Sequence, residues 1–202
     1  MNPAETNAPA TRHLDIGCGG RPRNPLARDQ LYAMDIHPQA PQLPAGTLAE
    51  YRCSNVVTDP IPYPDGFFHS VSAFDVVEHI PRTAFIDGRQ VFPFVQVMNE
   101  IHRVLAPGGE FYAITPVYPC MEVFTDPTHV NIITVRSHEY FCGTQPAARA
   151  YGFVGRFDCT EARLLDLKLH FSQGTAIDHL RSVWRRIRGR PRTHVLWRLR
   201  KA

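Results

Sequence analysis

The sequence lacks the features of a membrane-spanning protein, of a secreted protein and of a cysteine-based metal site. No apolar run reaches the roughly 18 residues that a membrane-spanning helix requires. Residues 1–11 are polar and contain no apolar core of a signal peptide. The five cysteines form no C-x-x-C pair and are odd in number, which argues against a zinc site and against a disulfide framework. We therefore expect a reducing, cytoplasmic location and no bound metal.

The dinucleotide-binding pattern G-x-G-x-x-G is also absent, because Pro22 occupies the position of its third glycine. The chain has instead the string Asp15-Ile16-Gly17-Cys18-Gly19-Gly20 at the end of a short apolar run. Glycines in such a turn let the backbone approach a ligand that a Cβ would push away. Asp35 follows about 20 residues later, a distance suited to an acid that binds ribose hydroxyls in a nucleotide-binding βαβ unit. The alternative is a glycine turn that binds nothing.

Length and charge indicate one domain with a basic end. The chain has 202 residues, 44% of them hydrophobic, which is enough for a single domain with a full core. Residues 181–202 hold nine basic and no acidic side chains, whereas the remainder holds 13 basic and 19 acidic ones, a net charge of −6. We expect a disordered N-terminus over residues 1–11, a globular domain over 12–175 and a basic amphipathic tail over 176–202.

Apolar runs alternate with helical periodicity along the domain, which predicts an α/β fold with a parallel, doubly wound sheet. The clearest helix runs from Phe94 to Leu105, after Pro93 and before the helix-ending Pro107-Gly108-Gly109. Strands are expected near 13–16, 30–35, 50–54, 69–74 and 110–115, followed by a helix near 137–151 and a closing hairpin of strands near 153–165 and 166–171.

Four motifs occur in an order that is typical of one enzyme family. The glycine turn is followed by Ile61-Pro62-Tyr63-Pro64-Asp65-Gly66, by Phe74-Asp75-Val76-Val77-Glu78-His79-Ile80, and by Glu100-Ile101-His102-Arg103-Val104-Leu105-Ala106-Pro107-Gly108-Gly109. Over roughly residues 14–116 the chain thus resembles the class I S-adenosylmethionine-dependent methyltransferases of the small-molecule type. The resemblance implies a mostly parallel, seven-stranded Rossmann-like sheet with helices on both faces. It also implies S-adenosyl-L-methionine as cofactor, with S-adenosyl-L-homocysteine as its product.

The resemblance also suggests which residues bind the cofactor. In the family the glycine turn wraps the methionine moiety, the later acid holds the ribose, and a polar residue, usually Asp, faces the adenine amine. Asn55 and Asp59 are the nearest candidates for this last role, and Asn55 is preferred because Asp59 lies in a proline-rich turn. His69 stands where the family usually has Asp. The expected cofactor-binding residues are Asp15, Gly17, Cys18, Gly19, Asp35, Ile36, Asn55 and Asp75.

Methyl transfer from a sulfonium mainly requires an acceptor placed in line with the bond that breaks, and a base if the acceptor is a hydroxyl. Histidine has a suitable pKa for this base. His129 belongs to a loop that follows the strand ending near Pro116, so we expect it over the acceptor site. His129 is the predicted base and Asp126 its orienting partner; the alternative is a capped turn in which His129 only packs. His79 is a second candidate, although the resemblance suggests that Glu78-His79 mainly shapes the pocket.

Two other methylation chemistries find little support in the sequence. Pro119-Cys120 follows the fifth predicted strand, as the nucleophile does in some enzymes that methylate cytosine C5 of RNA. Those enzymes also place a Pro-Cys pair after the fourth strand, where this chain has Glu78-His79. The string Asn-Pro-Pro-Tyr of amino-methylating enzymes is absent. Cys120 is therefore expected to be a loop cysteine without a catalytic role.

The basic tail has three interpretations. Apolar residues line one side of a predicted helix, and an amphipathic pattern resumes at 195–200; the apolar residues of that helix are Ile177, Leu180, Trp184 and Ile187. This side is expected to pack on the domain or on a second subunit in a homodimer. Alternatively, the arginines and tryptophans contact an anionic membrane surface. Binding of nucleic acid is less favoured, because no broad basic face with interleaved aromatic residues is found in the domain.

The prediction for function is an enzyme that methylates an oxygen or nitrogen of a small-molecule or glycan-type acceptor. One alternative is an RNA methyltransferase anchored by the basic tail. Another is a non-catalytic partner subunit that only binds the cofactor. The acceptor itself is left open, because acceptor-side loops vary freely on one fold.

Overall fold

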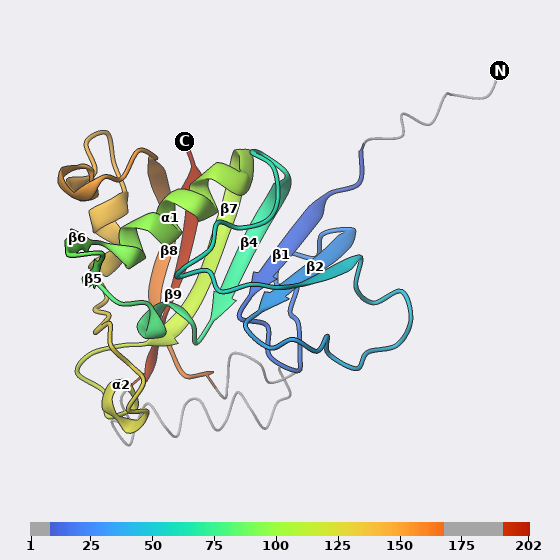
Figure 1. Ribbon diagram of the computed structural model, residues 1–202, viewed down its shortest axis with the longest axis horizontal. Coiled ribbons are helices and arrows are strands. Elements are labelled where there is room, and N and C mark those ends of the chain that lie inside the picture. The colour runs from blue at the N-terminus through green and yellow to red at the C-terminus, as the bar shows by residue number, and fades with distance from the viewer. Residues whose placement is uncertain (1–8, 168–191) are drawn as a thin grey trace.

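A computed structural model describes residues 9–167 and 192–202, and its central feature is a seven-stranded sheet (Figure 1). The strands lie in the order β3-β2-β1-β4-β7-β9-β8. Their bounds are β1 Arg12–Ile16, β2 Gln30–Asp35, β3 Glu50–Cys53, β4 Phe68–Phe74, β7 Leu105–Pro116, β8 Phe157–Leu165 and β9 His194–Lys201. Apart from β9, these strands overlap those predicted from the sequence.

Five neighbouring strands run parallel, from β3 through to β7, and β9 pairs antiparallel with both β7 and β8. The mostly parallel, Rossmann-like sheet is thus confirmed. The chain moves outward from β1 to β2 and β3 on one side, and from β4 to β7 on the other. In open α/β sheets, ligands bind at the carboxyl ends of the strands where the order reverses in this way. The edge formed by the ends of β1, β2 and β4 is therefore the place to look for a site.

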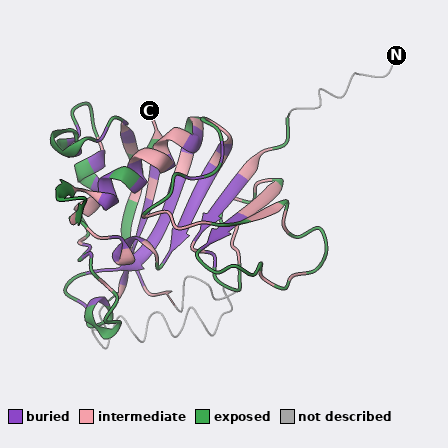
Figure 2. Ribbon diagram, in the orientation of Figure 1, coloured by how far each residue is buried: buried purple, intermediate pink, exposed green. Residues whose placement is uncertain are grey.

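Both faces of the sheet carry apolar side chains, and the central strands are its most buried part (Figure 2). Alternation along β7 sends Phe111 and Ala113 into the larger core and Tyr112 and Ile114 into the smaller one. The larger core lies between the sheet and helix α1. The smaller core is built from Phe74, Tyr112, Ile114, Leu165 and Leu196, with Leu26 and Leu167 packed against them.

Helix α1 spans Pro93–Val104 and crosses one face of the sheet (Figure 1). Its buried residues recur at helical spacing: Phe94, Val95, Val97, Met98, Ile101 and Val104. Pro93 fits the first turn, where its missing N–H costs nothing. In the described residues α1 is the only helix longer than five residues, and the links from β1 to β4 contain no helix. None of the described helices is long and apolar enough to cross a membrane.

Strand β9 corrects the prediction of a separate tail over residues 176–202. Residues 194–201 form a strand inside the sheet, in which Val195, Trp197 and Leu199 enter the larger core and Leu196 the smaller one. These side chains are buried by the domain, so they are not available to a membrane or a second subunit. The helix predicted around Ile177–Ile187, like residues 1–8 of the predicted disordered N-terminus, lies outside the described residues.

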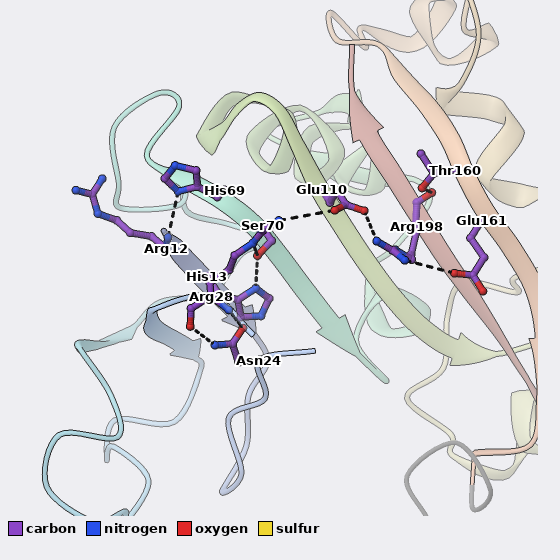
Figure 3. Close-up of polar contacts among 10 residues, drawn as sticks. All are labelled: Arg12, His13, Asn24, Arg28, His69, Ser70, Glu110, Thr160, Glu161 and Arg198. Carbon is purple, nitrogen blue, oxygen red and sulfur yellow. Dashed lines mark hydrogen bonds and ion pairs between the residues drawn. The ribbon is translucent and has the colours of Figure 1, made fainter. Parts of the chain in front are cut away.

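The Arg198 side chain of β9 has acidic partners on both neighbouring strands (Figure 3). Arg198 Nη2 lies 2.7 Å from Glu110 Oε2 on β7, and its Nη1 lies 3.8 Å from Glu161 Oε2 on β8. Glu110 also pairs with Arg28 at 3.7 Å, ahead of β2. The network ties three strands together, so the charges that suggested an anionic partner are partly used within the domain.

Three further parts of the chain differ from expectation. The helix predicted near 137–151 is two 3₁₀ turns, η2 Ser137–Phe141 and η3 Ala147–Tyr151, separated by Gly143 at φ +85°. In the described residues β8 pairs with β9, and most of the strand predicted as its hairpin partner, residues 166–171, lies outside the described residues. A small hairpin that was not predicted, β5 Ala84–Ile86 and β6 Arg89–Val91, turns at Asp87-Gly88 with both residues at positive φ. The remaining short elements are η1 Val77–His79 and α2 Glu122–Thr125.

Candidate functional site

At the glycine turn that follows β1, the backbone lies unusually close to neighbouring parts of the chain. Gly17 has φ +63° and donates its N–H to Met34 O at 2.7 Å. A Cβ on Gly17 would lie 2.4 Å from Val76 Cγ2, closer than real Cβ atoms come to any neighbour. Gly19, at φ +53°, faces open space instead. Gly17 is therefore required for packing, and Gly19 leaves room for a ligand.

Asp35 ends β2 beside this turn. Its Oδ2 accepts the Gly19 N–H at 2.8 Å and its Oδ1 accepts the His37 N–H at 3.1 Å. One oxygen of the Asp35 carboxylate thus fixes the glycine turn, and the other fixes the chain just after β2. A hollow of about 280 Å³ lies next to it, lined by Gly19, Gly20, His37, Pro38, Gln39, Ala40 and Pro41. Ile36 is 65% exposed at the same edge, so it can cover a bound ring.

Asp15 lies beneath the turn in a chain of buried polar groups. Ser72 Oγ donates to Asp15 Oδ1 at 2.5 Å, and the Arg23 N–H donates to Oδ2 at 2.8 Å. Because the Ser72 hydrogen points to Asp15, His13 Nε2 donates to Ser72 Oγ at 2.8 Å, and His13 Nδ1 accepts from Ser70 at 2.7 Å (Figure 3).

Burial controls the charge of the groups beneath the turn. It raises the pKa of Asp15 to about 7 and lowers the pKa of His13 to about 3, so the imidazole is neutral at physiological pH. The Cys18 thiol also has its pKa raised by burial, to about 12, with Asp15 and Asp35 adding to the effect. Cys18 is therefore protonated and shapes the turn as a small apolar group.

Two other predicted cofactor residues have partners within the chain. Asn55 Oδ1 accepts the Val57 N–H at 3.0 Å and so closes an Asx turn after β3. An adenine amine at this position would have to share that oxygen. Asp75, at φ +54°, directly follows β4, and its Oδ1 lies 3.4 Å from His194 Nε2.

A second hollow, of about 500 Å³, opens at the carboxyl ends of β4 and β7. It is lined by Asp75, Glu78, Pro116, Glu122, Thr125, Asp126, Pro127, His129 and His194. Val76, which touches Gly17, directly follows Asp75, so the glycine turn and this hollow adjoin at the end of β4. The hollow is where an acceptor would meet a ligand held by the turn.

His129 lies in this hollow as predicted, but Asp126 does not contact its ring. His129 Nδ1 donates to Val123 O at 3.1 Å, and Nε2 faces Glu78 Oε1 at 3.9 Å. Asp126 Oδ1 instead accepts from Thr128 Oγ1 at 2.6 Å, and Thr128 Oγ1 contacts His79 Nδ1 at 3.0 Å. The orienting effect of Asp126 therefore reaches His79 through Thr128, and Val123 orients His129.

Glu78 also lines this hollow, where the sequence predicted only that it shapes the pocket. It is only 1% exposed, and burial raises its pKa to about 7 although Thr115 Oγ1 donates to its Oε2 at 2.9 Å. The rings of His79 and His129 meet edge to face with their centroids 4.8 Å apart. The Glu-His pair was visible in the sequence, but its closeness to residue 129 depends on a loop about 50 residues further on.

With this geometry established, comparison with known proteins identifies the domain. A family model described as a methyltransferase domain matches residues 14–113, about half of the chain. The chain belongs to this methyltransferase family. The methyltransferase is of class I and uses S-adenosylmethionine, as the motifs predicted. A comparison of the methyltransferase with curated proteins gives no match.

Solved structures show the same fold at low sequence identity. The methyltransferase aligns over 96% of its length with 87% of an S-adenosylmethionine-dependent methyltransferase from Archaeoglobus fulgidus, at 14% identity and a TM-score of 0.56. A complex between the Haloferax volcanii Trm112 methyltransferase activator and a methyltransferase aligns with a TM-score of 0.58 at 14% identity. The alignment covers 96% of this chain and 83% of that chain.

A third solved structure includes the spent cofactor. Geranyl diphosphate C-methyltransferase from Streptomyces coelicolor, solved with Mg²⁺, geranyl diphosphate and S-adenosyl-L-homocysteine, gives a TM-score of 0.51 at 12% identity. The alignment covers 95% of this methyltransferase and 71% of that chain. At such identities the relatives share the fold, and their acceptors do not transfer to this enzyme.

Asp35→Ala is expected to weaken binding of S-adenosylmethionine by roughly 10- to 100-fold, because charge-assisted hydrogen bonds are worth about 1.5–3 kcal/mol. Calorimetric titration of the folded protein measures this change. Asp158→Ala is the matched control, since Asp158 lies on β8 at the opposite edge of the sheet and pairs with Arg200. Equal affinities for both variants would remove Asp35 from the cofactor site.

Proposed function

We propose that this methyltransferase transfers the methyl group to an oxygen or nitrogen of a small-molecule or glycan-type acceptor bound in the hollow over β4 and β7. The observation that carries the proposal is the position of His129 Nε2, at the hollow and beside Glu78, while Nδ1 is held by a backbone carbonyl. An imidazole fixed in this way presents a lone pair to the acceptor.

The cofactor supplies an activated methyl group, so the protein's task is to bind, orient and exclude water. Asp35 and the open side of Gly19 would hold its ribose, and Asp75 would hold the methionine end. Asp15, buried and bonded to Ser72 and to the Arg23 N–H, would act by fixing the turn from beneath. On the acceptor side His129 Nε2 takes the proton from the attacking hydroxyl, or deprotonates an ammonium so that the neutral amine can attack. Glu78, 3.9 Å away, stabilises the imidazolium that results.

His129→Ala is expected to lower turnover by about 10²-fold or more, the usual contribution of a positioned base, with cofactor affinity unchanged. Formation of S-adenosyl-L-homocysteine is measured with acceptor-containing extracts, and cofactor binding by calorimetry. Turnover equal to the parent protein would exclude His129 from the mechanism. Cofactor binding without turnover on any acceptor would favour the partner-subunit alternative.

The RNA alternative depended on the basic tail. Part of that tail is strand β9, where Arg198 is committed to Glu110 and Glu161. Arg200 and Lys201 of the same strand also have partners, Asp158 and Leu105 O, so part of the charge of the tail is already neutralised or bonded within the domain, which favours a small acceptor over RNA. A salt titration of RNA binding would reverse this preference if affinity fell steeply with ionic strength.

A further inference from the structure

Three side chains at the end of β4 bring potential metal ligands together. Glu78, His79 and His129 each offer one donor atom, and these atoms lie within 4.8 Å of one another. Two of the residues are neighbours in η1, and the third comes from the loop after α2. The loop is held against η1 by its own backbone, because the N–H groups of Val130 and Asn131 both donate to Glu78 O.

Glu78 supplies the first sign of a missing partner. Its Oε1 is buried and accepts no hydrogen bond from the described residues, although the side chain is 98% buried. A buried carboxylate oxygen without a donor is costly, so it indicates a group that occupies the space in front of it. The other oxygen, Oε2, is fixed by Thr115 Oγ1 at 2.9 Å, which turns Oε1 toward His129.

Both histidines have their Nδ1 engaged. His129 Nδ1 donates to Val123 O, and His79 Nδ1 contacts Thr128 Oγ1, whose hydrogen goes to Asp126 Oδ1. Histidines that bind metals nearly always donate their other ring nitrogen to a carbonyl or, directly or through a relay, to a carboxylate. Within the described part of the chain, neither Nε2 makes a hydrogen bond, so each ring presents one lone pair.

We propose that Glu78, His79 and His129 bind a divalent transition-metal cation of the Zn²⁺ or Co²⁺ type. Two histidines and one carboxylate are a donor set that suits such cations and leaves coordination positions open. Ligands about 2.1 Å from a tetrahedral metal lie about 3.4 Å apart, so the 3.9 Å between His129 Nε2 and Glu78 Oε1 needs only a small contraction. The open positions would face the hollow in which Glu78 and His129 lie.

The role of the cation, unlike its binding, rests on the proposed acceptor class and replaces the assignment of His129 as the base. An acceptor hydroxyl bound to the cation loses its proton to water more readily, because a bound cation lowers the pKa of a coordinated O–H. The oxygen then forms a bond to the methyl carbon while the carbon–sulfur bond breaks and its electrons pass to sulfur. In this mechanism His129 is a ligand that activates the acceptor through the metal, instead of taking the proton itself.

Titration of chelator-treated protein with Co²⁺ tests the binding, followed by visible absorption and by calorimetry with Zn²⁺. The parent protein is expected to bind one cation and to develop the d–d absorption of a low-coordinate Co²⁺ site. Glu78→Gln, which keeps the acceptor for Thr115, and His129→Ala should each weaken binding by more than about 100-fold. Thr128→Val should weaken it by roughly 10- to 100-fold, the usual effect of an outer partner.

Glu122→Gln is the matched control, because Glu122 is an exposed acid lining the same hollow outside the cluster. It should retain the parent affinity. Circular dichroism establishes that each variant is folded. Failure of the folded parent protein to bind Co²⁺ or Zn²⁺ would overturn the proposal, as would equal losses in Glu78→Gln and Glu122→Gln.

The same measurements separate this proposal from the proposed function. Methyl transfer that persists in chelator-treated protein, together with no cation binding, would leave His129 as a base and remove the metal. Cation binding without methyl transfer on any acceptor would keep the metal site and remove the proposed acceptor chemistry.

Discussion

Gly17→Ala abolishes measurable binding of S-adenosylmethionine and destabilises the protein by several kcal/mol: this is the largest effect that we expect from a single methyl group in this chain. The added Cβ would lie 2.4 Å from Val76 Cγ2, and the residue would have to keep φ at +63°. Relief requires the turn to move, which breaks the 2.7 Å bond from Gly17 N to Met34 O and displaces Gly19 from Asp35. Calorimetry with the cofactor and urea denaturation measure the two losses.

Two companion variants show whether the steric contact is the cause. Gly20→Ala should be nearly neutral, because a Cβ there has no neighbour within 4 Å and its φ is not positive. In the double variant Gly17→Ala, Val76→Ala the contacting Cγ2 is gone, so part of the stability and of the affinity should return. A double variant as weak as Gly17→Ala alone would show that backbone strain at φ +63°, and not Val76, dominates.

Asp15→Asn is expected to remove the decline in the stability of the cofactor-free protein between pH 5 and pH 8. Burial raises the pKa of Asp15 to about 7, so the native state keeps a proton that the unfolded chain releases near its ordinary value. The native state is therefore favoured most at low pH, and this contribution is lost as the pH rises toward 7. At about 1.4 kcal/mol per pH unit, the loss from pH 5 to pH 8 is about 3 kcal/mol.

The neighbouring His13 gives the opposite dependence, and the main cause is its own burial, which the substitution leaves in place. Its pKa is lowered to about 3 by burial, so the native state resists protonation and loses stability as the pH falls from about 6.5 toward 3. The variant should retain this acid limb. Asp29→Asn serves as control, because Asp29 is exposed and its pKa is lowered by hydrogen bonds from Thr11. An unchanged slope between pH 5 and pH 8 in Asp15→Asn would refute the raised pKa.

The parallel half of the sheet was predictable because each of its strands is apolar, short and bounded by turn residues. The strand predicted near 30–35 matches β2 Gln30–Asp35, and helix α1, Pro93–Val104, differs by one residue at each end from the predicted Phe94–Leu105. Strand β9 was mistaken for the end of a tail because arginines interrupt its apolar run. Its alternation was nevertheless visible: Val195, Trp197 and Leu199 share one face, and Arg198 finds its partners on the other.

The site was predictable where one short segment carries it. Gly17, Gly19 and Asp35 come together because a turn and the end of the next strand are joined by backbone hydrogen bonds. The acceptor side depends on contacts between distant segments, and spacing alone says nothing of them. Asp126 was expected to orient His129, three residues further along the chain, whereas its hydroxyl partner Thr128 contacts His79.

The position of β9 has a consequence for how the chain is made. Its residues pair with β7 residues 78–90 positions earlier in the sequence, from Pro116 with His194 to Glu110 with Arg200. During synthesis on the ribosome, β9 emerges after every other described element. The edges of β7 and β8 that pair with β9 in the folded domain therefore stay without this partner until then. Until then each presents unpaired backbone groups to neighbouring chains. Nascent molecules should therefore be prone to association through these edges until residues 194–201 have been synthesised.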